Sequence, residues 1–203
     1  KNMIYESPGS DPSAVELCSQ AVGPYEDSAS ADVTDFLRAH WTARRELIRL
    51  SETTQAYEPL VLAPEFDAVE FLIELGEDSE IYQAITSSGN VLWNSIYDAQ
   101  RKEAKRAVEI IIDYVVPRQV LPLLMVCVRK LKDEPEELAR FMQSFCGWTV
   151  RGVITRSWQK LPMETASANA CIALRDKPNI TTEDVYAAIA HMIPTDPEFA
   201  DAL

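Results

Sequence analysis

The sequence LPLLMVCVRKLK at residues 121–132 is followed directly by DEPEELARFMQSFCGWTVRGVI at residues 133–154. The first segment is apolar on almost every side, which predicts a helix buried in a core, with Pro122 tolerated in its first turn. In the second segment apolar side chains recur at helical spacing after Pro135, and two glutamates suit the positive end of a helix. We expect this second helix to continue to Lys160, where a basic side chain suits its other end.

Working outward, the same spacing predicts helices along the rest of the chain. Only six glycines occur, and alternating strand-like runs are nearly absent, so both observations favour an all-α protein folded as an irregular multi-helix bundle. The other predicted helices cover approximately residues 13–22, 33–50, 53–62, 65–86 with an interruption at Gly76, 92–116, 164–175 and 182–192, with a final turn that begins at Thr195.

The formal net charge of −13 argues against a domain that grips nucleic acid with its whole surface, and against electrostatic docking on an anionic membrane. This net charge does not exclude a local basic patch. The cysteines, Cys18, Cys127, Cys146 and Cys171, show no C-x-x-C spacing, which fits a reducing cytoplasm better than a disulfide framework. No apolar stretch reaches the roughly 18 residues that span a bilayer. Both ends of the chain resemble cuts within a longer protein.

The sequence contains no convincing catalytic, metal or cofactor site. His40 and His191 lie on different predicted helices, and a lone histidine on a helix is more often a packed or surface residue than a ligand. The stretch from Gly147 to Gly152 lacks the Lys-Ser/Thr of a phosphate loop, so close helix packing is the better interpretation of its glycines. The acidic pairs are typical of solvated helix termini.

Basic residues are the more informative groups in so acidic a chain. They either form salt bridges with glutamates on the same helix or contact phosphate. Arg151 lies in an otherwise apolar stretch, where an arginine needs a carboxylate or phosphate partner, and we expect an internal salt bridge. Trp41 shares an apolar stripe with Phe36 and should be core. The candidate phosphate or interdomain contacts are Arg38, Arg45, Arg101, Lys105, Arg151 and Arg156.

Several motifs occur in the order found in one known family. The segment Asp35-Phe36-Leu37-Arg38 with Trp41 resembles the D-F-L-R-x-x-W pattern of the GmrSD-type restriction endonucleases. The remaining matches are Lys1-Asn2-Met3-Ile4-Tyr5 to an L-x-K-N helix, Leu121-Pro122-Leu123-Leu124 to P-L-L, Val150-Arg151 to V-R-R with Gly152 in place of the second arginine, and Pro194-Thr195-Asp196-Pro197-Glu198-Phe199 to P-S-D-E-E-F.

The resemblance implies a helical middle region. Family members carry an N-terminal nucleotide-binding domain with a D-G-Q-Q-R motif and a C-terminal HNH domain that cuts DNA, and this chain contains neither motif. Residues 1–30 would then end the N-terminal catalytic domain, and residues 31–203 would form the helical domain. We expect a non-catalytic, cofactor-free scaffold that couples nucleotide sensing to DNA cleavage in an anti-phage enzyme.

The expected partners are the two flanking domains of the same protein, with DNA as a further candidate and no membrane. A helical protein–protein interaction or oligomerisation module without DNA contact is the alternative, and a small-ligand-binding helical bundle is a third. Salt-sensitive DNA binding would distinguish the first hypothesis from the second.

Overall fold

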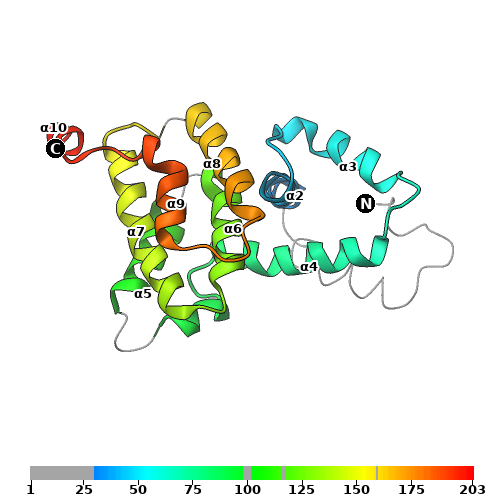
Figure 1. The fold of residues 1–203 in the computed structure, drawn as a ribbon, viewed down its shortest axis with the longest axis horizontal. Helices are drawn as coiled ribbons and strands as arrows, with labels where there is room; N and C mark the ends of the chain where they lie inside the picture. The colour runs from blue at the N-terminus through cyan, green and yellow to red at the C-terminus, as the bar shows by residue number, and fades with distance from the viewer. Residues whose placement is uncertain (1–29, 98–101, 116–117, 159) are drawn as a thin grey trace.

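The fold is known from a computed structural model that describes residues 30–97, 102–115, 118–158 and 160–203. These residues are helical with no strand among them, which confirms the predicted all-α multi-helix bundle (Figure 1). The helices predicted before residue 30, and Cys18, lie outside the described residues. In the described part of the chain, no helix has the length and apolar character needed to cross a membrane.

The helices are named in chain order, with η marking 3-10 or π turns. They are α2 (Ser30–Arg44), η2 (Leu50–Glu52), α3 (Thr53–Val61), α4 (Ala68–Ile85), η3 (Val91–Ser95), α5 (Lys102–Glu109), η4 (Ile110–Val115), η5 (Arg118–Val120), α6 (Leu121–Leu131), α7 (Pro135–Ile154), α8 (Lys160–Arg175), α9 (Thr182–Ile189), η6 (Ala190–Met192) and α10 (Asp196–Asp201).

Helix α6 is the centre of the bundle, as its sequence predicts. Every side chain from Leu121 to Val128 is buried, and α6 packs against α2, α4, α7 and α8. A helix that is apolar all round gains stability only when neighbours cover every side, which is why four helices surround this one. The polar end of α6, at Arg129 and Lys130, emerges from the core beside the ends of α2 and α8.

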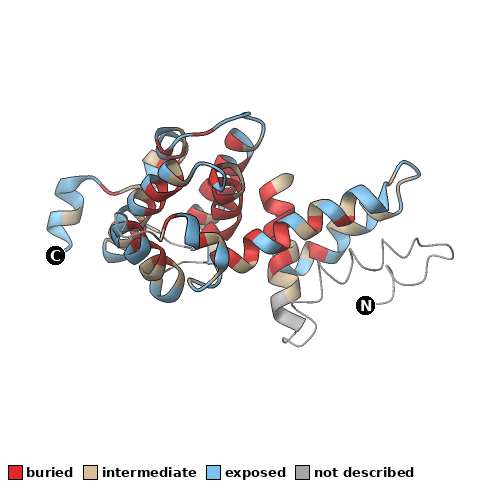
Figure 2. Ribbon diagram, turned by 90° about the horizontal axis from the view of Figure 1, so that it is seen from below, coloured by how far each residue is buried: buried red, intermediate tan, exposed pale blue. Residues whose placement is uncertain are grey.

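Helices α2, α3 and α4 form an arm on one side of the body, and α3 with the N-terminal half of α4 projects away from it (Figure 1). Asp67 caps α4 by accepting from two backbone N–H groups, and the helix then continues through Gly76, so the predicted interruption there is wrong. The buried part of the arm is the half next to the body, where Phe36 and Leu75 join the common core (Figure 2). Trp41 is 8% exposed, which confirms its predicted core position.

The long helix predicted from Pro135 to Lys160 is shorter than expected. Helix α7 ends at Ile154, and Arg156 adopts a positive φ of 57°, a conformation that turns the chain back on itself. The turn places the ring of Trp158 over Gly152, where an added Cβ would lie 2.3 Å from the ring. Gly152 therefore serves this close contact, whereas nothing lies within 4 Å of a Cβ added at Gly147, so close packing at Gly147 is wrong.

Three other boundaries also differ from the sequence prediction. The helix predicted over residues 92–116 is divided into η3, α5 and η4, and buried Trp93 in η3 donates to the carbonyl of Ala84. Helix α8 begins at Lys160, so Pro162 lies in its first turn instead of stopping α7. Helix α2 ends at Arg44 and not near Leu50.

Candidate functional site: a buried ion-pair cluster beside a basic cleft

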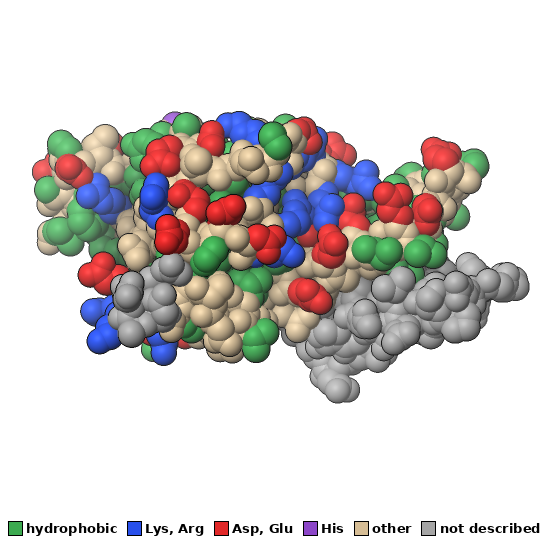
Figure 3. All heavy atoms as spheres, turned by 60° about the horizontal axis from the view of Figure 1, so that its bottom comes forward, with side chains coloured by type: hydrophobic (Ala, Val, Ile, Leu, Met, Phe, Trp, Pro, Cys, Tyr) green, Lys and Arg blue, Asp and Glu red, His purple; other side chains and the backbone are tan. Residues whose placement is uncertain are grey.

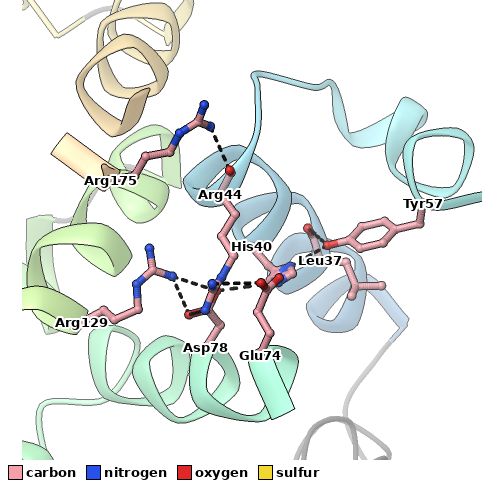
Figure 4. Close-up of polar contacts among 8 residues, drawn as sticks. All are labelled: Leu37, His40, Arg44, Tyr57, Glu74, Asp78, Arg129 and Arg175. Carbon is pink, nitrogen blue, oxygen red and sulfur yellow. Dashed lines mark hydrogen bonds and ion pairs between the residues drawn. The ribbon is translucent and has the colours of Figure 1, made fainter. Parts of the chain in front are cut away.

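A buried carboxylate joins the arm to the body of the molecule. Asp78, on α4, is 0% exposed and accepts hydrogen bonds from arginines on two other helices (Figure 4). The Nε atom of Arg44, on α2, lies 2.6 Å from Asp78 Oδ2, and Nη1 of Arg129, on α6, lies 2.8 Å from Asp78 Oδ1. We name this set, together with His40 and Glu74, the Asp78 cluster.

Helical spacing brings the members of the Asp78 cluster onto facing surfaces. His40 and Arg44 are four residues apart on α2, and Glu74 and Asp78 are four residues apart on α4, so each pair shares one helix face. The two faces meet, and Arg44 Nη1 also donates to Glu74 Oε2 at 3.0 Å. Burial alone would raise the pKa of Asp78, but its hydrogen bonds to Arg44 and the charges of Arg129 and Arg44 outweigh burial and lower that pKa. Asp78 is therefore an ionised carboxylate.

His40 lies at the inner end of the cluster. Its Nδ1 is 2.9 Å from the hydroxyl of Tyr57 on α3, and its Nε2 is 3.1 Å from Glu74 Oε1. Burial lowers the pKa of His40 to about 4, against the opposing charge of Asp78, so the imidazole is neutral at neutral pH. The hydroxyl of Tyr57 donates to the main-chain carbonyl of Leu37 at 2.9 Å, so its oxygen is left to accept from Nδ1–H of His40.

A basic cleft of about 580 Å³ opens beside the Asp78 cluster. The C-terminal ends of α2, α6 and α8 converge here, and five of the seven lining side chains are cations. The lining residues are Arg44, Arg45, Glu74, Arg129, Lys130, Arg175 and Asp176. Lys and Arg side chains gather near the middle of one face of the molecule, with carboxylates around them (Figure 3). We name this feature the basic cleft.

Arg175 holds the end of α2 in place at the basic cleft. Its Nη1 donates to the main-chain carbonyl of Arg44 at 2.8 Å (Figure 4) and to that of Arg45 at 2.5 Å. Arg44 is the last residue of α2 and Arg45 follows it, where the helix itself offers these carbonyls no partner. The contact explains why α2 ends at Arg44, and it fixes Arg44 where it meets Asp78.

The chemistry of the site is that of binding and support. No group of three or more potential metal ligands occurs in the described parts of the chain. Burial raises the pKa of Cys127 and Cys171, which keeps both thiols protonated and poorly nucleophilic. The ionised Asp78 is fully committed to its two arginines. The arrangement can hold three helices together and can present guanidinium N–H donors to a ligand in the cleft.

The residues predicted as contacts are scattered over the structure. Arg45 lines the basic cleft, with its guanidinium 5.1 Å from the ring centre of Trp41. Arg38 is 7% exposed and donates to Glu164 on α8 at 2.9 Å, so its charge is used internally.

The other predicted contacts lie away from the cleft. Lys105 is exposed, 3.9 Å from Glu109, and Arg156 is exposed in the turn after α7. Arg101 lies outside the described residues. Arg151 is bonded to Asp196 at 2.5 Å, which confirms a salt bridge, but Asp196 is 85% exposed, so the expected buried position of the pair is wrong.

Sequence reasoning missed the Asp78 cluster and most of the basic cleft. Arg129, Lys130 and Arg175 were not singled out, and His40 was interpreted as a lone histidine. A usable signal was present, because two polar residues four apart occur on each of two predicted helices, at His40 and Arg44 and at Glu74 and Asp78. Comparisons with protein-family models, curated proteins and solved structures find no match to this chain.

Proposed function

We propose that this chain is the non-catalytic helical coupling region of a GmrSD-type, nucleotide-stimulated DNA endonuclease. The ordered motifs described above support the family, from Asp35 through Val150-Arg151 to the segment at Pro194. In such an enzyme the region transmits the nucleotide-bound state of one flanking domain to the nuclease domain at the other end, and it acts within the cytoplasm.

The Asp78 cluster is the observation that carries this proposal. The arm meets the body where α4 packs against α6, and Asp78 on α4 binds Arg129 on α6 as well as Arg44 on α2 within the arm. The arm cannot move relative to α6 without separating Asp78 from Arg129, because these side chains sit on different helices. A displacement of the arm therefore reaches the core helix directly, as coupling between two flanking domains requires.

The test uses the full-length parent protein. Arg129→Met should abolish or strongly reduce the stimulation of DNA cleavage by nucleotide while nucleotide binding persists. Arg140→Met, which removes an exposed arginine on α7, serves as the matched control and should leave stimulation intact. A parent that neither binds nucleotide nor cuts DNA overturns the proposal, as does a folded Arg129→Met enzyme with normal stimulation. The isolated chain 1–203 should neither hydrolyse nucleoside triphosphates nor nick DNA.

A protein–protein interaction or oligomerisation module is the second candidate. Helix α10 stands apart from the body and is largely exposed (Figure 2). On the packed helices α7 and α9, Val153 is 48% exposed and Tyr186 is 47% exposed, which is apolar surface available to a partner. Sedimentation velocity over a wide concentration range tests this candidate, since self-association through these residues would be lost in a Val153→Ser/Tyr186→Ser variant.

A further inference from the structure

The basic cleft carries more positive groups than its internal partners use. Arg45 is exposed and has no carboxylate partner within the described residues. Arg129 reaches Asp78 through Nη1 alone, which leaves Nε and Nη2 as donors on its other edge. Burial, followed by the charge of Arg129, lowers the pKa of Lys130.

Some of the positive charge has a structural role. The C-terminal ends of three helices point at this cleft, and each carries roughly half a negative charge. Arg175 and Lys130 donate to main-chain carbonyls, of Arg44 and Arg45 in one case and of Lys177 in the other. Arg175 uses only Nη1 for its two carbonyls, which leaves Nη2 as a further donor, and the ammonium of Lys130 keeps two further N–H groups.

The two carboxylates that line the cleft oppose an anion only weakly. Glu74 already bonds Arg44 and His40, and burial raises its pKa, which favours its neutral form. Asp176 has an 85% exposed side chain that touches Arg175 only at 3.7 Å, so it is free to turn into solvent. A ligand with a negative charge and several acceptor oxygens would bind the N–H donors that stay available in the cleft.

We propose that the basic cleft binds a phosphate group of a nucleotide or of a nucleic acid. Phosphate matches the donors because guanidinium groups bind its oxygens in pairs, whereas a carboxylate offers only two acceptors. A volume of about 580 Å³ suits a ligand of nucleotide size. Exposed Arg45 and half-buried Lys130 would bind the incoming phosphate at the rim, and the fixed guanidinium of Arg129 would orient it. This inference does not depend on the family assignment.

The test titrates the chain 1–203 with inorganic phosphate, pyrophosphate, ATP without Mg²⁺ and a 20-base-pair DNA duplex, by calorimetry. The double variant Arg45→Gln/Lys130→Gln should weaken binding at least about tenfold, since each lost cation removes charge-assisted hydrogen bonds. Its thermal unfolding checks that it folds. The matched control is Lys105→Gln/Arg140→Gln, which removes two exposed cations away from the cleft, and it should bind like wild type.

The outcomes also separate the two sources of phosphate. Tighter binding of ATP and pyrophosphate than of DNA identifies a nucleotide site. Tighter binding of DNA, with a salt slope that falls by about two in the double variant, identifies a nucleic-acid backbone contact. The proposal is overturned if none of the four probes shows saturable binding, if the double variant binds like wild type, or if the control pair weakens binding equally.

Discussion

Neutralising Asp78 should destabilise the protein more than any comparable change at its surface. In Asp78→Asn the amide keeps the shape of the side chain, but the charge of Arg129 loses its carboxylate partner and Arg44 keeps Glu74 alone. Removal of one member of a buried ion pair costs roughly 3–5 kcal/mol. The side chains of Arg44 and Arg129 are 22% and 19% exposed, and water can partly solvate them. The lower end of that range, about 3 kcal/mol, therefore applies.

Urea unfolding followed by circular dichroism measures this loss, and a thermal scan should show a melting temperature lower by about 6–12 °C for a chain of this size. Asp196→Asn is the matched control, because it makes the same chemical change in a carboxylate that is 85% exposed and bonded to one arginine. An exposed pair of this kind contributes less than about 1 kcal/mol.

A double-mutant cycle with Arg129→Met assigns the loss to the contact itself. Asp78 and Arg129 touch directly, so their individual losses should not add, and a coupling energy of about 1–3 kcal/mol is expected. The reasoning is refuted if Asp78→Asn melts within about 2 °C of the Asp196→Asn control, or if the two losses at Asp78 and Arg129 simply add.

Three further changes test other parts of the structure. Trp41→Ala should cost about 3–5 kcal/mol by urea unfolding, as truncation of a buried aromatic side chain does, and a near-normal value would show Trp41 to be exposed. Arg151→Met should cost less than about 1 kcal/mol, because Asp196 is exposed, yet hydrogen exchange should speed up in α10, which Arg151 contacts. The pKa of His40 is lowered to about 4. Between pH 6.5 and pH 4 the unfolded chain therefore protonates this imidazole while the folded chain does not, so the free energy of unfolding decreases as the pH is lowered. The raised pKa of Glu74 changes stability in the opposite sense, so the effect of His40 is obtained by comparing His40→Gln with wild type. The free energy of unfolding of His40→Gln should decrease by about 3 kcal/mol less than that of wild type between pH 7 and pH 4.

The helical class and the central position of α6 were predictable from local pattern. An apolar run such as residues 121–128 has to be covered on every side, whatever the rest of the chain does. Boundaries were less predictable, because they depend on contacts between distant residues. The end of α2 is set by Arg175, more than 100 positions along the chain, and the end of α7 is set by the ring of Trp158 against Gly152.

The Asp78 cluster was hidden from sequence reasoning for the same reason. Asp78 lies 34 residues from Arg44 and 51 residues from Arg129, and each residue taken alone is an ordinary charged position on a helix. Only the packing of α2 and α4 against α6 removes water from the carboxylate and makes the arginines necessary. The basic cleft depends further on three helix ends that meet in space, a feature for which the sequence carries no periodic signal.

The Asp78 cluster and the basic cleft share Arg44 and Arg129, so occupancy of one site must affect the other. Linkage requires that phosphate binding and the Asp78 contact alter each other by the same free energy. In Asp78→Asn the guanidinium of Arg129 loses its internal counter-charge and that of Arg44 keeps Glu74 alone, so phosphate should bind the variant more tightly than wild type. The melting temperature of Asp78→Asn should therefore rise more with added pyrophosphate than that of wild type. Asp196→Asn is the control for the general effect of added salt. An equal rise in the melting temperatures of Asp78→Asn and Asp196→Asn would show that the two sites do not share their arginines.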